Sequence, residues 1–168
     1  RIAEIGNRGV LLLLAESTNI ERPGTSMSET TVGASFNNIF ADNTERRIFI
    51  ATFASNIHRI QQIIDLAVKY KRKVAFCGRS MINISAAAAR IGELRYPDDM
   101  VVDIDKIKKV EDKNLVIITT GSQGEPLSAL TRMASDEMAK VKLGYNDTVI
   151  ISASPIPGNE RMVYNVIN

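Results

Sequence analysis

Residues 47–77 read RIFIATFASNIHRIQQIIDLAVKYKRKVAFC and place a segment of helical period between two short apolar runs. The runs, residues 47–53 and 73–77, are largely apolar without a polar alternation, which is typical of strands buried on both faces of a parallel sheet. Between them, Ser55 is placed to cap a helix whose isoleucines recur on one face. The stretch therefore predicts a strand, a helix and a second, parallel strand.

The same alternation extends along the rest of the chain. Further β-prone runs occupy residues 10–14, 114–119 and 148–152, with a weaker run at 100–102 and a turn at 95–99. The expected helices begin at a capping box of Ser26 and Glu29, after Ser80 (running to about Ile91), at Pro126 in the first turn of residues 127–134, and after Asn159. Repeated right-handed βαβ crossovers predict an α/β fold: a three-layer α/β/α domain with an open, mostly parallel sheet.

The composition is that of an ordinary globular domain. The chain has 168 residues, of which 45% are hydrophobic and 24% charged, and its net charge is only +2. Any basic, nucleic-acid-binding surface must therefore be local. The basic residues at 69–73 and 106–109 are explained most simply as a solvated helix end and loop. Arg1 in place of a methionine, and an end inside an expected helix, indicate a fragment of a longer protein.

Cys77 is the only cysteine, so no disulfide can form within the chain. Its apolar surroundings in the sequence predict a buried, small hydrophobic residue rather than a nucleophile. No apolar run reaches the length of a membrane span, and no signal-peptide pattern is present at the start of the chain. These features together predict a cytoplasmic protein without membrane contact.

Small hydroxyl, amide and glycine residues follow each expected strand. In open α/β sheets, ligands bind beyond the carboxyl ends of the strands. Backbone N–H groups and hydroxyls at helix N-termini can hold an anion there, and the guanidinium of Arg79 suits a phosphate. For a single loop, turn and cap chemistry is the simpler explanation. Five such loops on one edge favour a ligand that carries phosphate; they comprise residues 16–19, 54–59, 78–80, 119–126 and 152–160.

Complete catalytic motifs are absent from the sequence. Residues 121–124 (GSQG) are not followed by the Lys-Ser/Thr pair of a P-loop, and no G-x-G-x-x-G follows the first run. The chain has one histidine, His58, which cannot build a hydrolytic zinc site alone and is expected to be a partly buried helix residue. The chain by itself therefore predicts binding rather than catalysis.

Several of these segments resemble the β-CASP domain of bacterial ribonuclease J. The matching stretches are LAESTN (14–19), ERPG (21–24), ATFASNIHRIQQ (51–62), GRSM (78–81), TTGSQGEPLSALTRMA (119–134) and ISASPIPGNE (151–160). They follow one another in the family's order over nearly the whole chain. The resemblance implies that residues 1–168 form a single, Rossmann-like β-CASP domain, which this family inserts into a metallo-β-lactamase domain that is absent here.

The resemblance also implies a function for the longer protein. The family cleaves RNA, as an endonuclease and as a 5′-to-3′ exonuclease that prefers a 5′-monophosphate on single-stranded RNA. Two metal ions, usually zinc with manganese or magnesium assisting, activate the attacking water in such enzymes. The histidine motifs that hold them are expected before residue 1 and after residue 168. The chain alone is therefore expected to hold no metal and to be inactive.

The resemblance implies roles for particular residues. Glu16 stands at the family's acidic motif A, where aspartate is frequent, so glutamate is a mild departure. Part of the RNA path is expected along the loops that end the strands. The residues expected there are Arg79, Ser80, Thr120, Gly121, Ser122, Gln123, Gly124, Glu125, Ser152, Ser154 and Asn159.

Two other functions remain open from the sequence. Residues 120–125 (TGSQGE) resemble the sugar-phosphate loop of sugar-isomerase-like α/β proteins, which would make the chain a stand-alone phosphosugar-binding module. A structural or oligomer-forming domain, in which the small residues serve turns alone, is the third possibility.

Overall fold

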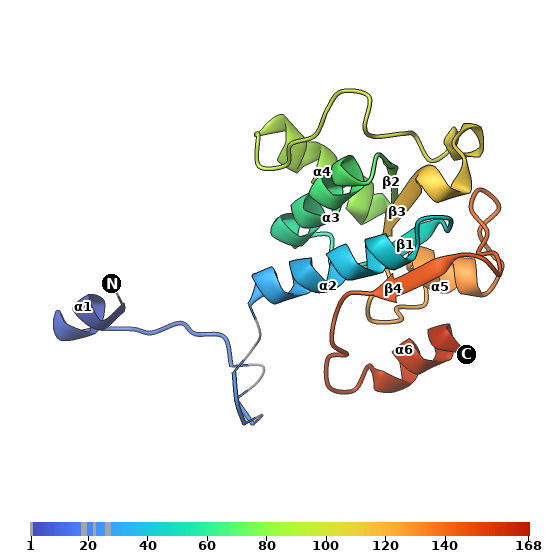
Figure 1. The fold of residues 1–168 in the computed structure, drawn as a ribbon. Helices are drawn as coiled ribbons and strands as arrows, with labels where there is room; N and C mark the ends of the chain where they lie inside the picture. The colour runs from blue at the N-terminus through green and yellow to red at the C-terminus, as the bar shows by residue number, and fades with distance from the viewer. Residues whose placement is uncertain (1, 18–19, 22, 26–27) are drawn as a thin grey trace.

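The computed structural model describes residues 2–17, 20, 21, 23–25 and 28–168. Four parallel strands form one sheet in the order β2-β3-β1-β4. Their bounds are Ile48–Ala51 for β1, Lys73–Cys77 for β2, Leu115–Thr119 for β3 and Thr148–Ile151 for β4. Val101 adds a single parallel bridge to Val74 outside β2. This confirms the predicted α/β fold with a parallel sheet (Figure 1).

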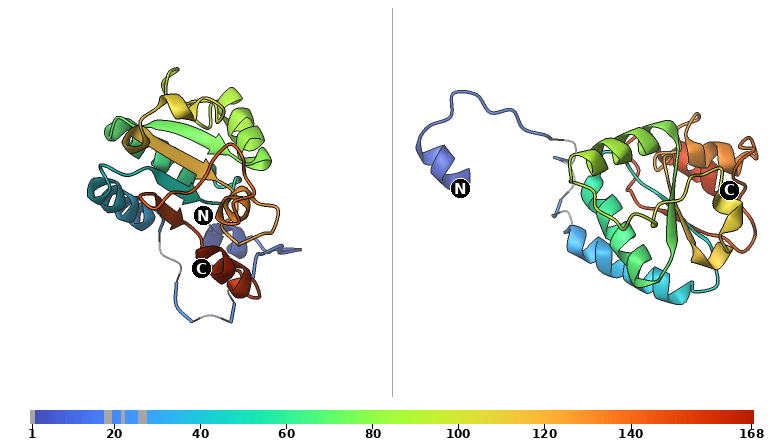
Figure 2. Two further views of the ribbon diagram at one scale, coloured as in Figure 1. Left: turned by 90° about the vertical axis from the view of Figure 1, so that its right-hand side faces the viewer. Right: turned by 90° about the horizontal axis from the view of Figure 1, so that it is seen from above.

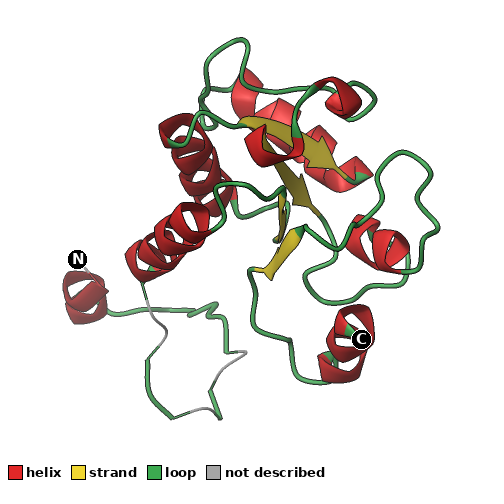
Figure 3. Ribbon diagram, turned by 45° about the vertical axis from the view of Figure 1, so that its right-hand side comes forward, coloured by secondary structure: helices red, strands yellow, loops and turns green. Residues whose placement is uncertain are grey.

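Helices cover both faces of the sheet, and the layers are visible in Figure 3. The first face packs against α2 (Glu29–Asp42), α3 (Ile57–Lys69) and α4 (Arg79–Arg90), with Ile48 and Ile50 of β1 pointing toward them. The second face, which includes Phe49, packs against α5 (Ala129–Ala134) and the 3₁₀ turn η1 (Ile107–Lys109). Successive residues of a strand point to opposite faces, so a run without polar residues can bury both. The arrangement is the expected three-layer α/β/α sandwich.

The remaining elements lie outside these layers. The 3₁₀ turn η2 (Asp112–Asn114) leads into β3, and α6 (Glu160–Ile167) packs beside α5. The helix α1 (Ile2–Asn7) and the stretch that follows lie away from the sheet, as Figures 1 and 2 show. None of the helices in the described part of the chain is long and apolar enough to cross a membrane.

The predicted strand at residues 10–14 is wrong. These residues have no regular secondary structure and pair with no strand in the described part of the chain, and Leu11 and Leu14 are more than four-fifths exposed. An apolar run signals burial, but strand formation also requires a neighbour for its backbone hydrogen bonds. The other strand predictions hold, with ends shifted by at most two residues, and the run at 100–102 supplies only the Val101 bridge.

The helix starts differ from the predictions in detail. The N-cap of α3 is Asn56 rather than Ser55, because the Asn56 side chain accepts a hydrogen bond from the Arg59 backbone at 3.2 Å. Pro126 lies in a turn, and α5 begins only after the N-cap Ser128. The helix expected after Ser80 begins two residues earlier, at Arg79, and ends at Arg90. Asn159 is the N-cap of α6, as expected. The predicted cap of α2 at Ser26, which itself lies outside the described residues, is wrong, because α2 begins at Glu29 directly after the N-cap Ser28.

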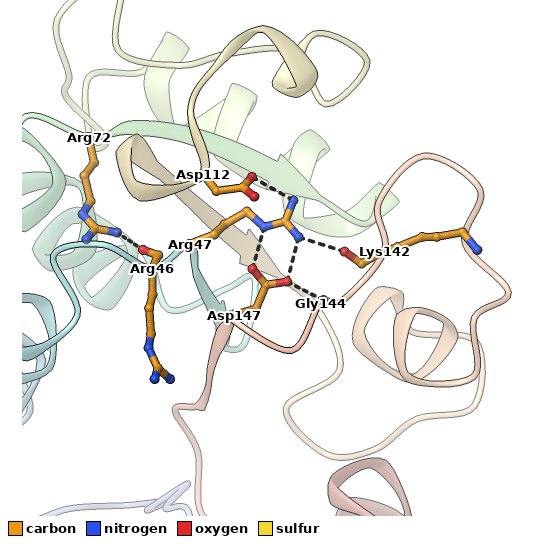
Figure 4. Close-up of polar contacts among 7 residues, drawn as sticks. All are labelled: Arg46, Arg47, Arg72, Asp112, Lys142, Gly144 and Asp147. Atoms are coloured by element: carbon orange, nitrogen blue, oxygen red, sulfur yellow. Dashed lines mark hydrogen bonds and ion pairs between the residues drawn. The ribbon is translucent and has the colours of Figure 1, made fainter.

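A network of hydrogen bonds centred on Arg47 joins segments at the amino ends of the strands (Figure 4). The Arg47 guanidinium donates two hydrogen bonds to the Asp147 carboxylate, at 2.9 and 2.7 Å, and one to the Lys142 carbonyl at 2.9 Å. Burial by itself would lower the pKa of Arg47, but the hydrogen bonds and negative charge of Asp147 outweigh it, so the pKa is raised. The pair joins the starts of β1 and β4, which are 100 residues apart in the chain.

Candidate nucleic-acid interface

The carboxyl ends of the four strands lie level, so their loops share one edge of the sheet. Ala51 of β1 pairs with Thr119 of β3 and with Ile151 of β4, and Cys77 of β2 also pairs with Thr119. The loops that follow must therefore lie side by side. This is the edge at which parallel α/β sheets bind their ligands.

A groove of about 910 Å³ opens at this edge beyond β2 and β3. Its polar lining includes Ser80, Thr120 and Ser128, and its apolar lining includes Ile104 and Met138. Three cationic side chains border it from three elements: Arg79 at the start of α4, Arg132 in α5, and Lys140 in the loop after α5. Among the described residues of the lining, Glu125 is the only acidic one. The groove is therefore locally cationic although the chain is nearly neutral.

The three cations differ in how they are held. Arg79 is exposed, and its guanidinium forms no hydrogen bond or ion pair with any residue in the described part of the chain. Lys140 forms an ion pair with Asp105 at 2.7 Å, and Arg132 donates to the Glu137 carbonyl at 3.4 Å. Arg79 is therefore the cation most free to bind an anionic ligand.

The loop after β3 is folded tightly against its neighbours. Gly78 and Gly121 have φ angles of +102° and +110°, which favour glycine. A Cβ at Gly78 would lie 2.6 Å from the Thr120 hydroxyl, and one at Gly121 would lie 2.5 Å from the Ser128 hydroxyl. The Thr120 hydroxyl also accepts a hydrogen bond from the Ala129 backbone at 3.1 Å, which holds the start of α5 against β3.

Gln123 ties the loops after β3 and β4 together. Its amide nitrogen donates to the Ser154 carbonyl at 3.0 Å. Its amide oxygen accepts from the Ile156 backbone at 2.7 Å and from the Asn159 side chain at 3.3 Å. The side chain is buried, so these bonds satisfy groups that water cannot reach. Asn159 thus turns its amide toward Gln123 and makes no cap hydrogen bond in α6.

The structure divides the predicted RNA-binding residues into three groups. Four of them line the groove: Arg79, Ser80, Thr120 and Glu125. Four form the buried loop beside it: Gly121, Ser122, Gln123 and Gly124. Three lie in the loop after β4 or at its end: Ser152, Ser154 and Asn159. RNA contact by any of them stays a prediction.

Other residues are placed differently from what their positions in the sequence indicated. Glu16 is exposed and follows no strand, because residues 10–14 pair with no strand in the described part of the chain. His58 is exposed on α3 rather than partly buried, because the buried stripe of that helix passes through Ile60, Ile63 and Ile64. Arg132 and Lys140 were not predicted, since only the folding of α5 back over the sheet brings them to the groove.

Cys77 lies at the end of β2, at the bottom of the groove, and is 3% exposed. Burial raises the pKa of its thiol, so the side chain stays protonated, as predicted for a small hydrophobic residue. Within the described ranges, no three His, Cys, Asp or Glu side chains gather closely enough to hold a metal ion. The described residues therefore do not fit the metal centre that the resemblance to metal-dependent nucleases implies for the longer protein, and we derive no metal-assisted step from them.

Known proteins resemble this chain over most of its length. Residues 45–168 match the family described as "Ribonuclease J, beta-CASP domain", which covers the whole sheet and the groove. The chain belongs to this family. Ribonuclease J proteins from Synechocystis and Thermus thermophilus are 44% and 45% identical to it over 168 residues, its whole length. Ribonuclease J2 from Bacillus subtilis is 42% identical over 98% of the chain.

The β-CASP chain spans only part of these relatives, namely 26% of the Synechocystis protein and 29% of each of the other two. The matches identify a ribonuclease J β-CASP domain, and none of them supports the phosphosugar-binding alternative.

Proposed function

We propose that this chain is the RNA-binding part of a ribonuclease J that cleaves RNA with metal ions held elsewhere in the longer protein. The observation that carries the proposal is the cationic groove at the carboxyl edge of the sheet, lined by Arg79, Arg132 and Lys140. In this proposal a metallo-β-lactamase domain of the same polypeptide closes over the groove, and single-stranded RNA lies between them.

The groove suits a single-stranded RNA backbone. Arginine forms paired hydrogen bonds to phosphate, and Ser80 and Thr120 place hydroxyls beside Arg79. The described residues that line the groove include no aromatic side chain, so we expect recognition of phosphates rather than stacking of bases. This favours binding with little sequence preference, as general RNA degradation requires.

The finer features of the parent enzyme belong to the proposal as well. They are endonuclease and 5′-to-3′ exonuclease activity, preference for a 5′-monophosphate, zinc with manganese or magnesium as the metals, and action in the cytoplasm. A buried, unpaired thiol at Cys77 is compatible with that compartment. Glu16 would act with the metal-binding part of the parent rather than with the groove.

The first experiment measures binding of a 5′-monophosphorylated, single-stranded RNA to the 168-residue chain by fluorescence anisotropy at several salt concentrations. We expect weak binding whose logarithm falls with the logarithm of salt, by roughly 0.7 for each phosphate contacted. Arg79→Ala should weaken binding and reduce this slope by about 0.7, the contribution of one phosphate contact. Arg90→Ala, at the other end of α4, removes the same charge and should change neither.

The second experiment compares RNA cleavage by the chain with cleavage by the complete parent protein. With zinc, manganese or magnesium we expect cleavage by the parent only. Metal-dependent cleavage by the pure chain would contradict the division of roles. Saturable binding of a hexose phosphate, together with indifference to RNA, would restore the phosphosugar alternative.

A further inference from the structure

Arg59 connects two segments that lie far apart in the sequence and meet at the carboxyl edge. Its guanidinium donates two hydrogen bonds to the Glu29 carboxylate, at 3.1 and 2.5 Å. A third hydrogen bond, of 2.7 Å, goes to the Ser152 carbonyl. The side chain is only 13% exposed. The Arg59 backbone is itself fixed, because its N–H donates to the Asn56 cap of α3.

The two partners of Arg59 mark the ends of two elements. Glu29 is the first residue of α2, and Ser152 is the first residue after β4. Gln62, one turn further along α3, donates to the Glu29 carbonyl at 3.2 Å and reinforces the attachment of α2. The start of α2, the start of α3 and the end of β4 are therefore held at one point.

The loop after β4 is held at two places. Arg59 fixes the loop at Ser152, and Gln123 fixes it again at Ser154 and Ile156. Hydrogen bonds and the backbone of residues 152–154 thus connect α2, through Arg59 and the β4 loop, to the β3 loop, whose Thr120 and Glu125 line the groove. A change at Arg59 would reach the groove's border through these contacts.

The chemistry of the contact requires arginine. The planar guanidinium group can donate hydrogen bonds to a carboxylate and to a carbonyl at the same time, whereas a lysine ammonium acts as a point charge. Because the Glu29 side chain is 45% exposed, the ion pair itself adds little stability. The main effect of the Arg59 contact is therefore to fix the position of the loop after β4, and its effect on the stability of the fold is small.

We propose that Arg59 is a positioning residue of the RNA path, which holds the loop after β4 in the geometry that presents it to RNA beside the groove. This inference rests on the proposed function. It deepens that function by naming a residue outside the groove that controls RNA binding.

The test uses the full-length nuclease that contains this chain, with Arg59→Lys and, as a matched control, Arg47→Lys. Arg47 makes the same kind of contact, a two-point pair with Asp147 and a bond to the Lys142 carbonyl, at the opposite edge of the sheet. We expect Arg59→Lys to lower kcat/KM on single-stranded RNA about tenfold or more, mainly through a higher KM, since a displaced loop loses contacts that bind RNA equally in the ground state and the transition state. Arg47→Lys should leave cleavage unchanged.

Hydrogen exchange gives a readout that does not depend on activity. In Arg59→Lys, the amides of residues 152–156 should exchange faster than in the wild-type protein, and in Arg47→Lys they should not. Glu29→Gln keeps Arg59 but weakens its anchor, and serves if Arg59→Lys does not fold. It should raise KM less than Arg59→Lys does, and the double variant should be no worse than Arg59→Lys alone, because the two residues act as one unit.

Unchanged KM and unchanged exchange in Arg59→Lys, or in Glu29→Gln if that variant replaces it, would overturn the inference. Equal losses of cleavage in Arg59→Lys and Arg47→Lys would also overturn it, because they would reflect weakened folding alone. A wild-type parent that neither binds nor cleaves RNA would overturn the proposed function together with this inference. Normal wild-type cleavage with an unaffected Arg59→Lys would overturn the role of Arg59 only.

Discussion

Gly124 shows how closely the loop after β3 packs against the last helix. Its φ angle is +70°, and a Cβ built there would collide with the carbonyl carbon of Met162. Because that atom belongs to the backbone of α6, it cannot rotate away as a side chain could. Gly92 has a similar φ angle of +80°, but a Cβ there would meet nothing within 4 Å. Substitution of alanine at Gly92 therefore measures the cost of backbone strain alone, whereas substitution at Gly124 measures strain and a steric clash together.

We expect Gly124→Ala to lower the free energy of unfolding by about 3 kcal/mol, because strain and clash both act. Gly92→Ala should lower it by about 1 kcal/mol, through strain alone. Urea denaturation of the two variants and the wild-type chain measures the difference. Equal losses would show that α6 does not rest on Gly124.

The reactivity of Cys77 measures whether solvent reaches the side chain at the end of β2 that lines the groove. Because burial raises the pKa of its thiol, we expect very slow reaction with a maleimide at neutral pH and rapid reaction after unfolding in guanidinium chloride. The raised pKa also means that thiol burial stabilises the fold below the ordinary thiol pKa, and that this contribution is lost as the pH rises above it. Labelling of the folded chain as fast as that of the unfolded chain would show that the groove opens down to β2.

At the scale of elements, the start of α3 depends on one side chain. Asn56 caps α3 through a hydrogen bond to the Arg59 backbone, whereas Ser55 is exposed and its hydroxyl makes no hydrogen bond within the described structure. The two residues are adjacent, and both are of a type that caps helices, so the sequence pattern could not separate them. The deciding factor is which side chain points along the helix axis once β1 has turned into α3.

Asn56→Ala should therefore destabilise the chain by about 1 kcal/mol, the usual cost of a lost cap. Ser55→Ala, the change at the position that the sequence favoured, should stay within about 0.5 kcal/mol of the wild type. Thermal and urea unfolding of both variants measures this. A larger loss in Ser55→Ala than in Asn56→Ala would place the cap at Ser55 after all.

At the scale of the whole molecule, the described residues before α2 contribute nothing to the core. Every described residue from Ile2 to Thr25 is exposed, and the buried clusters begin with Phe36. Apolar area that stays in contact with water gives no stabilisation on folding. The α/β body should therefore be stable without the first 27 residues.

Deletion of residues 1–27 should leave the free energy of unfolding within about 0.5 kcal/mol of the full chain, since every described residue that is removed is exposed. Circular dichroism during urea unfolding gives the comparison. A loss of several kcal/mol would mean that the exposed leucines at 11–14 pack on the α/β body in solution. RNA affinity measured on the same shortened chain would show whether the groove works without them.

The amino-acid sequence is sufficient to predict the class of fold and the edge on which the candidate site lies. Apolar runs without alternation mark strands that are buried on both faces, and the helices between them force those strands to be parallel. The carboxyl ends of parallel strands meet at one edge, so the sequence alone assigns Arg79, Thr120 and Ser152 to the same side of the sheet. All of these inferences depend on residues that are near one another in the chain.

The composition of the groove, the fate of residues 10–14 and the burial of the loop after β3 follow from the tertiary structure, because they depend on contacts between distant segments. The order β2-β3-β1-β4 brings Arg132 and Lys140 to the groove beside Arg79. Residues 10–14 have the composition of a buried strand, but no described strand pairs with them. Ser122 and Gln123 look like ligand-binding residues in the sequence, yet they are buried inside the loop. Local patterns indicate that a side chain will be buried or will form a hydrogen bond, whereas its partner is set by how the elements pack.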